Sequence, residues 1–131
     1  MADEKTMNHT SILLLATVCA LLTATGQIAL KAGVSSPALA SLLSTAGTGE
    51  FILRAAITPL VILGLLLYGA STVLWLVVLA RADVSYAFPL VSLGFIFTTL
   101  YAHFALHEVL TTGRLTGIAL IVLGVICVVR S

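Results

Sequence analysis

Charged residues are scarce in this sequence. Of 131 residues, six are lysine or arginine and five are aspartate or glutamate, so charged residues make up 8% of the chain. Soluble domains carry about 25%, and a chain with so few charges cannot cover a water-facing surface. Since 60% of the residues are hydrophobic, the composition predicts a membrane protein. The sequence has no cluster of basic residues, so we expect no nucleic-acid partner.

Cysteines and catalytic motifs are also scarce. Cys19 and Cys127 lie inside apolar runs. They form neither a disulfide framework nor a metal-binding spacing, and we interpret both as small buried hydrophobic residues. His103 and His107 are four residues apart, but Glu108 points about 100° away from His107 on a helix, so no third metal ligand is evident. Without paired carboxylates, a nucleophile motif or a phosphate-binding glycine loop, we expect no enzymatic activity, no metal and no cofactor.

Four long apolar runs dominate the chain. Each is close to the length of about 20 residues that a membrane-spanning helix needs. Only helices fit, because every backbone group inside a bilayer must be paired within the protein. We therefore predict an all-α membrane protein with a single four-helix transmembrane domain over residues 1–131. The predicted spans are residues 10–32, 55–80, 84–106 and 113–130. We expect the first of them to be retained in the mature protein.

The connections leave two questions open. Residues 33–53 form the one long loop, in which Pro37 precedes the apolar stretch Ala38–Leu43. This loop is either a flexible linker or a short helix at the membrane interface, since proline favours a first helical turn. The positive charges of the two membrane faces balance, so they do not fix the orientation. One face has Lys5, Arg81 and Arg130, and the other has Lys31, Arg54 and Arg114. The chain can therefore pair antiparallel with itself, pair with a sister subunit, or be oriented by other factors.

One lysine lies inside an apolar span. The run Thr10–Ala32 carries a single charge, Lys31, and Gln27 and Thr23 precede it by four and eight residues. Residues four apart on a helix lie nearly above one another, so these three form one polar stripe. Alone, a lysine this close to a helix end would snorkel to the membrane surface. Polar groups at membrane depth, however, usually face a bundle interior or a cavity, and the stripe predicts an anionic ligand at Lys31.

Polar and aromatic residues also follow one face of the second span and one seam of the third. The face of the second span is either a packed helix contact, which suits Gly64 and Ser71, or a cavity wall, which suits Tyr68 and Trp75. In the third span, Pro89 removes a backbone hydrogen bond and permits a bend. Bent helices in transporters often face the substrate path. The face of the second span consists of Gly64, Tyr68, Ser71, Thr72 and Trp75, and the seam of the third span consists of Ser85, Pro89, Ser92, Thr99 and His103.

The fourth span is aliphatic between Gly117 and Gly124. Two glycines seven residues apart share a helix face and allow close approach of another backbone. We therefore predict a dimer interface there. Glu108 and His103 lie at the end of the third span, on the same membrane face as Lys31. An ion pair between Glu108 and Lys31, structural or acting as a gate, is a further prediction.

The sequence also resembles a known family. The stretches GQIALKAG (Gly26–Gly33), ADVSYAFPLVSLGF (Ala82–Phe95) and LHE (Leu106–Glu108) resemble the drug/metabolite transporter (EamA-like) superfamily, and the chain has the size of its small multidrug resistance branch. The closest resemblance is to subunits implicated in flipping undecaprenyl-phosphate-linked aminoarabinose across the bacterial inner membrane, in lipopolysaccharide modification. Small multidrug exporters use a glutamate in the first helix. The alignment places Thr23 at that position, which argues against a cationic drug as substrate.

The resemblance and the polar stripe together favour a flippase for a polyprenyl-phosphate-linked sugar. Lys31 would hold the phosphate, and the sugar would meet Gln27, Thr23, Tyr68, Trp75, Ser92 and Thr99. The expected partners are this lipid-linked sugar, membrane lipids, and a second copy or a sister subunit. Two other functions stay open. One is a proton-coupled exporter that uses Glu108 or His103, and the other is a partner subunit that does not itself transport.

Overall fold

The computed structural model describes residues 8–130, which form seven helices and no strand. Lys5, counted above with one membrane face, lies outside the described residues. Four stretches are long and apolar enough to cross a membrane: His9–Val34, Pro59–Leu79, Val84–Leu106 and Thr112–Arg130. The predicted all-α fold with four transmembrane spans is therefore confirmed. The helices are α1 (His9–Val34), α2 (Pro37–Thr45), α3 (Thr48–Ala56), α4 (Pro59–Leu79), α5 (Val84–Val91), α6 (Leu93–Leu106) and α7 (Thr112–Arg130).

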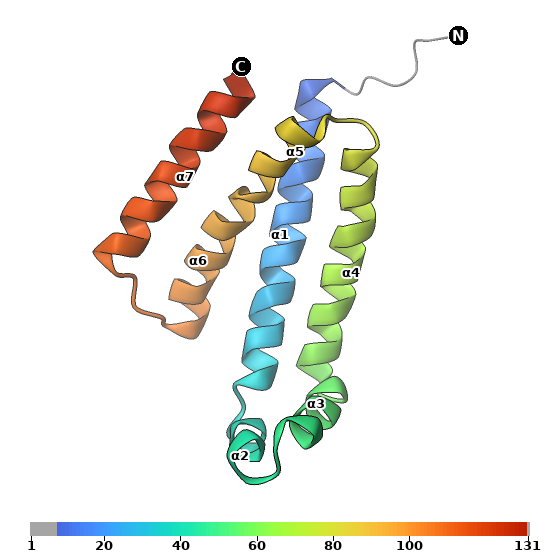
Figure 1. The fold of residues 1–131 in the computed structure, drawn as a ribbon, viewed down its shortest axis with the longest axis vertical. Helices are drawn as coiled ribbons and strands as arrows, with labels where there is room; N and C mark the ends of the chain where they lie inside the picture. Colours follow the sequence, from blue (N-terminus) through green and yellow to red (C-terminus); the bar gives the residue numbers. More distant parts are fainter. Residues whose placement is uncertain (1–7, 131) are drawn as a thin grey trace.

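The spans lie side by side, with α1 between α4 and α6 and with α7 beyond α6 (Figure 1). The start of α1 and the end of α7 lie at one end of the molecule, and α2 and α3 lie at the other. Large apolar side chains on the spans are exposed, for example Leu66 on α4, Phe104 on α6 and Leu120 on α7. In a bilayer such surfaces face lipid or another apolar helix, so they carry no penalty there.

The long connection between the first two spans is helical rather than a flexible linker. Pro37 occupies the first turn of α2, where its fixed φ angle and missing N–H are tolerated. Gly47, at φ 87°, separates α2 from α3. Such a positive φ is costly for residues with a Cβ atom. In α3, Arg54 Nε donates to Glu50 Oε1 at 3.0 Å across one helical turn. Because α3 runs to residue 56, the second span begins at residue 59 rather than at 55.

The third span is broken as Pro89 predicts. Its first part, α5, ends at Val91, and α6 begins at Leu93. Pro89 cannot donate a backbone hydrogen bond. Ser92 lies between the two helices, and its hydroxyl donates to the Pro89 carbonyl. The span therefore consists of two helices, and both of them contact α1.

Two sets of contacts hold the spans in place around this break. α1 and α4 meet at glycines: a Cβ atom added to Gly64 would lie 2.8 Å from the Gly26 carbonyl oxygen and 2.7 Å from Leu30 Cγ. The packing interpretation of Gly64 is thus correct. A buried cluster then closes the bundle near the start of α1, and it draws on α1, α4, α5 and α7. Its members are Ile12, Ala16, Val78, Ala87, Leu90 and Val125.

Candidate functional site

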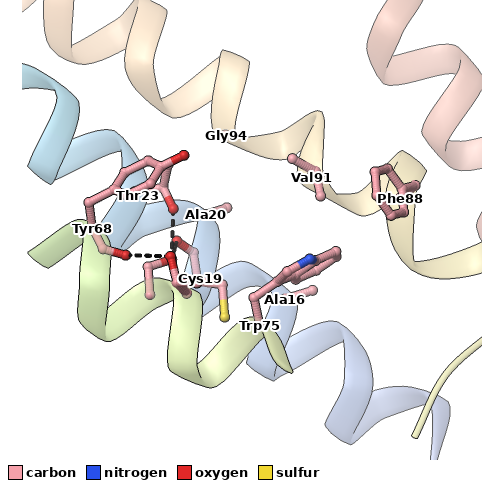
Figure 2. Close-up of a pocket in the computed structure, with 11 residues that line it drawn as sticks. Ala16, Cys19, Ala20, Thr23, Tyr68, Trp75, Phe88, Val91 and Gly94 are labelled. Carbon is pink, nitrogen blue, oxygen red and sulfur yellow. Dashed lines mark hydrogen bonds between the residues drawn. The ribbon is translucent and has the colours of Figure 1, made fainter. Parts of the chain in front are cut away.

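A cavity of about 230 Å³ lies between α1, α4 and the broken third span. Thr23 is near the middle of α1 and Ser71 near the middle of α4, so the cavity lies at the depth of the bilayer core. Figure 2 shows the residues of α1 and α4 on one side and those of α5 and α6 on the other. Among residues 8–130, none of those that line it is charged. The lining residues are Ala16, Cys19, Ala20, Thr23, Tyr68, Ser71, Thr72, Trp75, Phe88, Val91 and Gly94.

Two hydroxyl groups join α1 to α4 at the cavity wall. Ser71 is 3% exposed, and its Oγ donates to the Cys19 carbonyl oxygen at 2.9 Å. Thr23 Oγ1 lies 2.7 Å from Ser71 Oγ. The carbonyl can only accept, so the single proton of Ser71 is used there and Thr23 must donate to Ser71. The sequence favoured helix packing over a cavity wall for Ser71; in the structure Ser71 bonds to α1 and also lines the cavity.

Aromatic rings supply much of the remaining wall. Trp75 and Phe88 meet edge to face, with ring centroids 6.2 Å apart and planes at 79°. Tyr68 comes from the same face of α4 as Trp75, about two helical turns away on the side of Thr23 (Figure 2). Three of the residues predicted to bind substrate, Thr23, Tyr68 and Trp75, therefore line one cavity. Phe88 was not predicted; its place before Pro89 at the bend is the one sequence signal that pointed to it.

Gln27 and Lys31 lie outside the cavity lining and are exposed. They follow Thr23 by four and eight residues, so they continue along the same side of α1. Side chains on a helix lean toward its N-terminus, and that direction takes Lys31 back toward Gln27 and Thr23. Within residues 8–130 the one ion pair is Arg54–Glu50. Lys31 has no acidic partner there.

Ser92 and Thr99 lie outside the cavity lining. The Ser92 hydroxyl donates to the Pro89 carbonyl oxygen, and Thr99 Oγ1 donates to the Phe95 carbonyl oxygen at 2.7 Å. Both hydroxyls thus serve the backbone of their own span. Their contact with substrate stays a prediction.

His103 and Glu108 form a turn at the end of α6. His107 adopts a left-handed conformation at φ 54°, and the chain folds back so that His103 Nδ1 lies 2.9 Å from the Glu108 carbonyl oxygen. Glu108 forms no ion pair with Lys31 in the described part of the chain, and its gating role stays a prediction. Residues 8–130 contain no group of three or more His, Cys, Asp or Glu placed to bind a metal.

Gly117 and Gly124 leave open space on α7. A Cβ atom added to either one would meet no atom within 4 Å. The α7 helix contacts α5 and α6, but these two glycines take no part in close packing within the chain. Their predicted use in a dimer stays open.

Several curated proteins resemble this chain. One from Pseudomonas fluorescens, named a probable 4-amino-4-deoxy-L-arabinose-phosphoundecaprenol flippase subunit ArnE, is 35% identical over 120 residues, which cover 92% of this chain and 97% of that protein. A protein of the same name from Salmonella enteritidis is 37% identical over 100 residues, covering 67% and 88%. Another from an Enterobacter species is 45% identical over 64 residues, covering 49% and 60%. No protein-family model and no solved structure matches the chain.

Proposed function

This chain belongs to the family of 4-amino-4-deoxy-L-arabinose-phosphoundecaprenol flippase subunits called ArnE, and we propose that it moves a polyprenyl-phosphate-linked sugar across the bacterial inner membrane. The family relation and the four membrane-spanning helices make it a multi-pass protein of that membrane. The relatives are named as flippase subunits rather than enzymes. We accordingly assign the chain a transport step and no chemical step.

The observation that carries the proposal is the arrangement along one side of α1. Thr23 faces a mid-membrane cavity without charge, and Lys31 lies eight residues further along the helix, about 12 Å away at 1.5 Å per residue. A lipid-linked sugar phosphate has two parts that match these two features. One is a polar sugar ring, which is uncharged or carries an amino group, and the other is an anionic phosphate. In our proposal the sugar enters the cavity, and the ammonium group of Lys31 holds the phosphate as a point charge. Gln27 lies between the two parts.

The cavity size sets a limit on what it holds. Sites for drug-sized ligands span about 300–1,000 Å³, and this cavity is about 230 Å³. It therefore suits one sugar ring and leaves no room for a polyprenyl tail. The tail would stay in the bilayer against the exposed apolar faces of the spans. The buried cluster that includes Ile12, Val78 and Leu90 lies toward the start of α1, so we place the entrance on the Lys31 side.

A subunit that acts only together with a second protein is the other candidate, because the relatives are named as subunits. We propose that the active form contains either two copies of this chain or one copy and a sister subunit, joined through the open face at Gly117 and Gly124. Proton-coupled export is less favoured, because none of the described residues that line the cavity carries a carboxylate.

Reconstitution tests the function directly. Purified protein is placed in liposomes with a polyprenyl-phosphate-linked aminopentose, and an amine-reactive reagent that does not cross membranes is added outside. We expect labelling to exceed the outer-leaflet fraction with time, because flipped lipid presents its amine to the reagent. Movement only after a sister subunit is added supports the two-protein form. No movement in either case contradicts the proposal.

A further inference from the structure

A second cavity lies at the end of the bundle where α2 and α3 meet the start of α4 (Figure 1). Its volume is about 480 Å³, and it shares no lining residue with the cavity at Thr23. The wall is mostly apolar, with Leu39 and Leu42 from α2 and Ile57 at the end of α3. Among the described residues that line it, Arg54 is the one with a charge. The cavity thus combines an apolar floor with a single cation.

This second cavity lies at the boundary of the membrane. The helix α4 has 21 residues and is about 30 Å long at 1.5 Å per residue, which matches the thickness of the hydrocarbon core. Pro59, the first residue of α4, also lines the second cavity. The cavity is therefore at the depth where the acyl chains of one leaflet end and the headgroups begin.

The side chains of α3 are arranged as in a helix that lies in this boundary. Glu50 and Arg54 are one turn apart on one side of the helix. Ile52 and Leu53 lie on another side, where they are 59% and 67% exposed, and Ile57 at the helix end is 68% exposed. A helix with one charged side and one apolar side is typical of the membrane interface. The exposed apolar surface beside the cavity therefore faces acyl chains.

The guanidinium group of Arg54 provides the polar contact. Within residues 8–130 its side chain pairs with Glu50 alone, through Nε, so the two terminal NH2 groups keep four N–H donors. A guanidinium group binds a phosphate through two parallel hydrogen bonds and is more weakly hydrated than an ammonium group. Ser36 adds a hydroxyl group that does not cap α2. None of the described lining residues is acidic, so the wall offers nothing to a headgroup ammonium.

We propose that this cavity binds one anionic phospholipid of the adjoining leaflet, a lipid of the phosphatidylglycerol type. Its phosphate is held by Arg54, and the upper part of an acyl chain lies against Leu42 and Ile57. A headgroup without an ammonium group is favoured, because the lining supplies a cation and no anion. The bound lipid anchors α2 and α3 at the membrane boundary. It takes no part in transport, because Arg54 lies outside the cavity at Thr23.

The test is a competition between two phospholipids that differ in the headgroup. Purified protein in detergent is mixed with equal amounts of phosphatidylglycerol and phosphatidylcholine of the same acyl chains, and native mass spectrometry measures the ratio bound. We expect the wild-type protein to favour phosphatidylglycerol. Arg54→Gln should lower the ratio by about tenfold, the effect of one lost charge-assisted bond. Arg114→Gln removes another cation of the same membrane face, outside this cavity, and should leave the ratio unchanged.

Three further variants separate lipid binding from the ion pair and from folding. Glu50→Gln breaks the same exposed pair, whose loss costs little stability, but it keeps the guanidinium group and should keep or raise the ratio. Ala38→Trp fills the cavity and should lower the amount of bound phosphatidylglycerol. Ala40→Trp adds the same side chain at an exposed position of α2 outside the lining and should have no effect.

Four results would overturn the proposal. They are equal binding of the two lipids by the wild-type protein, an unchanged ratio in Arg54→Gln, equal losses in Glu50→Gln and Arg54→Gln, and a lipid-free dimer that Ala38→Trp disrupts. The last result would mean that a second copy of the chain fills the cavity. Because the measurement does not involve the lipid-linked sugar, each of these results leaves the proposed function intact.

Discussion

Thr23 Oγ1 on α1 and Ser71 Oγ on α4 lie 2.7 Å apart, although 48 residues separate them in the chain. The contact lies at mid-membrane depth, where water is not available to satisfy a hydroxyl. It joins the two helices at the wall of the cavity that both residues line. One pair of small hydroxyl residues thus links the packing of the bundle to the chemistry of its site.

The Thr23–Ser71 contact can be measured as a coupling energy. We expect the stabilities of Thr23→Val, Ser71→Ala and the double variant to be non-additive by about 0.6 kcal/mol, the average for hydrogen bonds between membrane helices. Reversible unfolding in mixed micelles gives the four values of the cycle. Thr99→Val combined with Ser71→Ala is the control, because Thr99 bonds within its own helix. Additive values for Thr23 and Ser71 would show that the bond contributes nothing to stability.

The α1–α4 contact should be sensitive to one added methyl group. In Gly64→Ala the new Cβ would lie 2.7 Å from Leu30 Cγ and 2.8 Å from the Gly26 carbonyl oxygen, so the helices must move apart. We expect a loss of about 1–3 kcal/mol, the usual cost of overpacking. Gly69→Ala on the same helix meets no atom within 4 Å and should be close to neutral. Thermal unfolding of both variants, compared with the wild type, decides the point.

Trp75 is the single tryptophan of the chain and lines the cavity. Its fluorescence therefore reports on that space without any label. Titration with the amino-sugar lipid should shift the emission and saturate, because the sugar replaces solvent or lipid next to the indole ring. The polyprenyl phosphate without a sugar should bind with little change in emission. A shift of equal size from both lipids would place the sugar outside the cavity.

The break at Pro89 should matter for transport more than for folding. With Pro89→Ala the chain can form a continuous helix from α5 into α6, which would move Phe88 relative to Trp75 and reshape the cavity. We expect a several-fold slower lipid transfer in liposomes with little change in thermal stability. Pro59→Ala at the start of α4 is the matched control, since a proline in the first turn interrupts no helical hydrogen bond. If Pro89→Ala transfers lipid at the wild-type rate, the helix break is not needed for transport.

The sequence predicted the parts of the fold that follow from hydrophobic length and from local breakers. The four spans and the interruption at Pro89 are of this kind, and both are present. The helix α3 was not predicted, because it has only nine residues and a helix of that length is marginal without tertiary packing. The cavity was predicted in part: Tyr68 and Trp75 stood out as aromatic residues at membrane depth.

The partner of Thr23 could not be predicted from the sequence. Helical spacing placed Ser71 on the polar face of its span, but the residue that it meets depends on how α1 and α4 are aligned. That alignment is set by the close approach of Gly26 and Gly64, a contact between helices that no local pattern encodes. The direction of the Thr23 proton in turn depends on the Cys19 carbonyl. Three-dimensional geometry was required for both.

The central claim, that Lys31 holds the lipid phosphate during flipping, is tested most directly by the rate of amino-sugar lipid transfer in liposomes with Lys31→Met. A sister subunit is included if transfer requires it. Arg54→Met neutralises another charge on the same membrane face, one that pairs with Glu50, and serves as the control. We expect Lys31→Met to lower the rate by about tenfold or more, the effect of losing a charge-assisted bond, while Arg54→Met transfers lipid at close to the wild-type rate. Transfer by Lys31→Met at the wild-type rate would contradict the account.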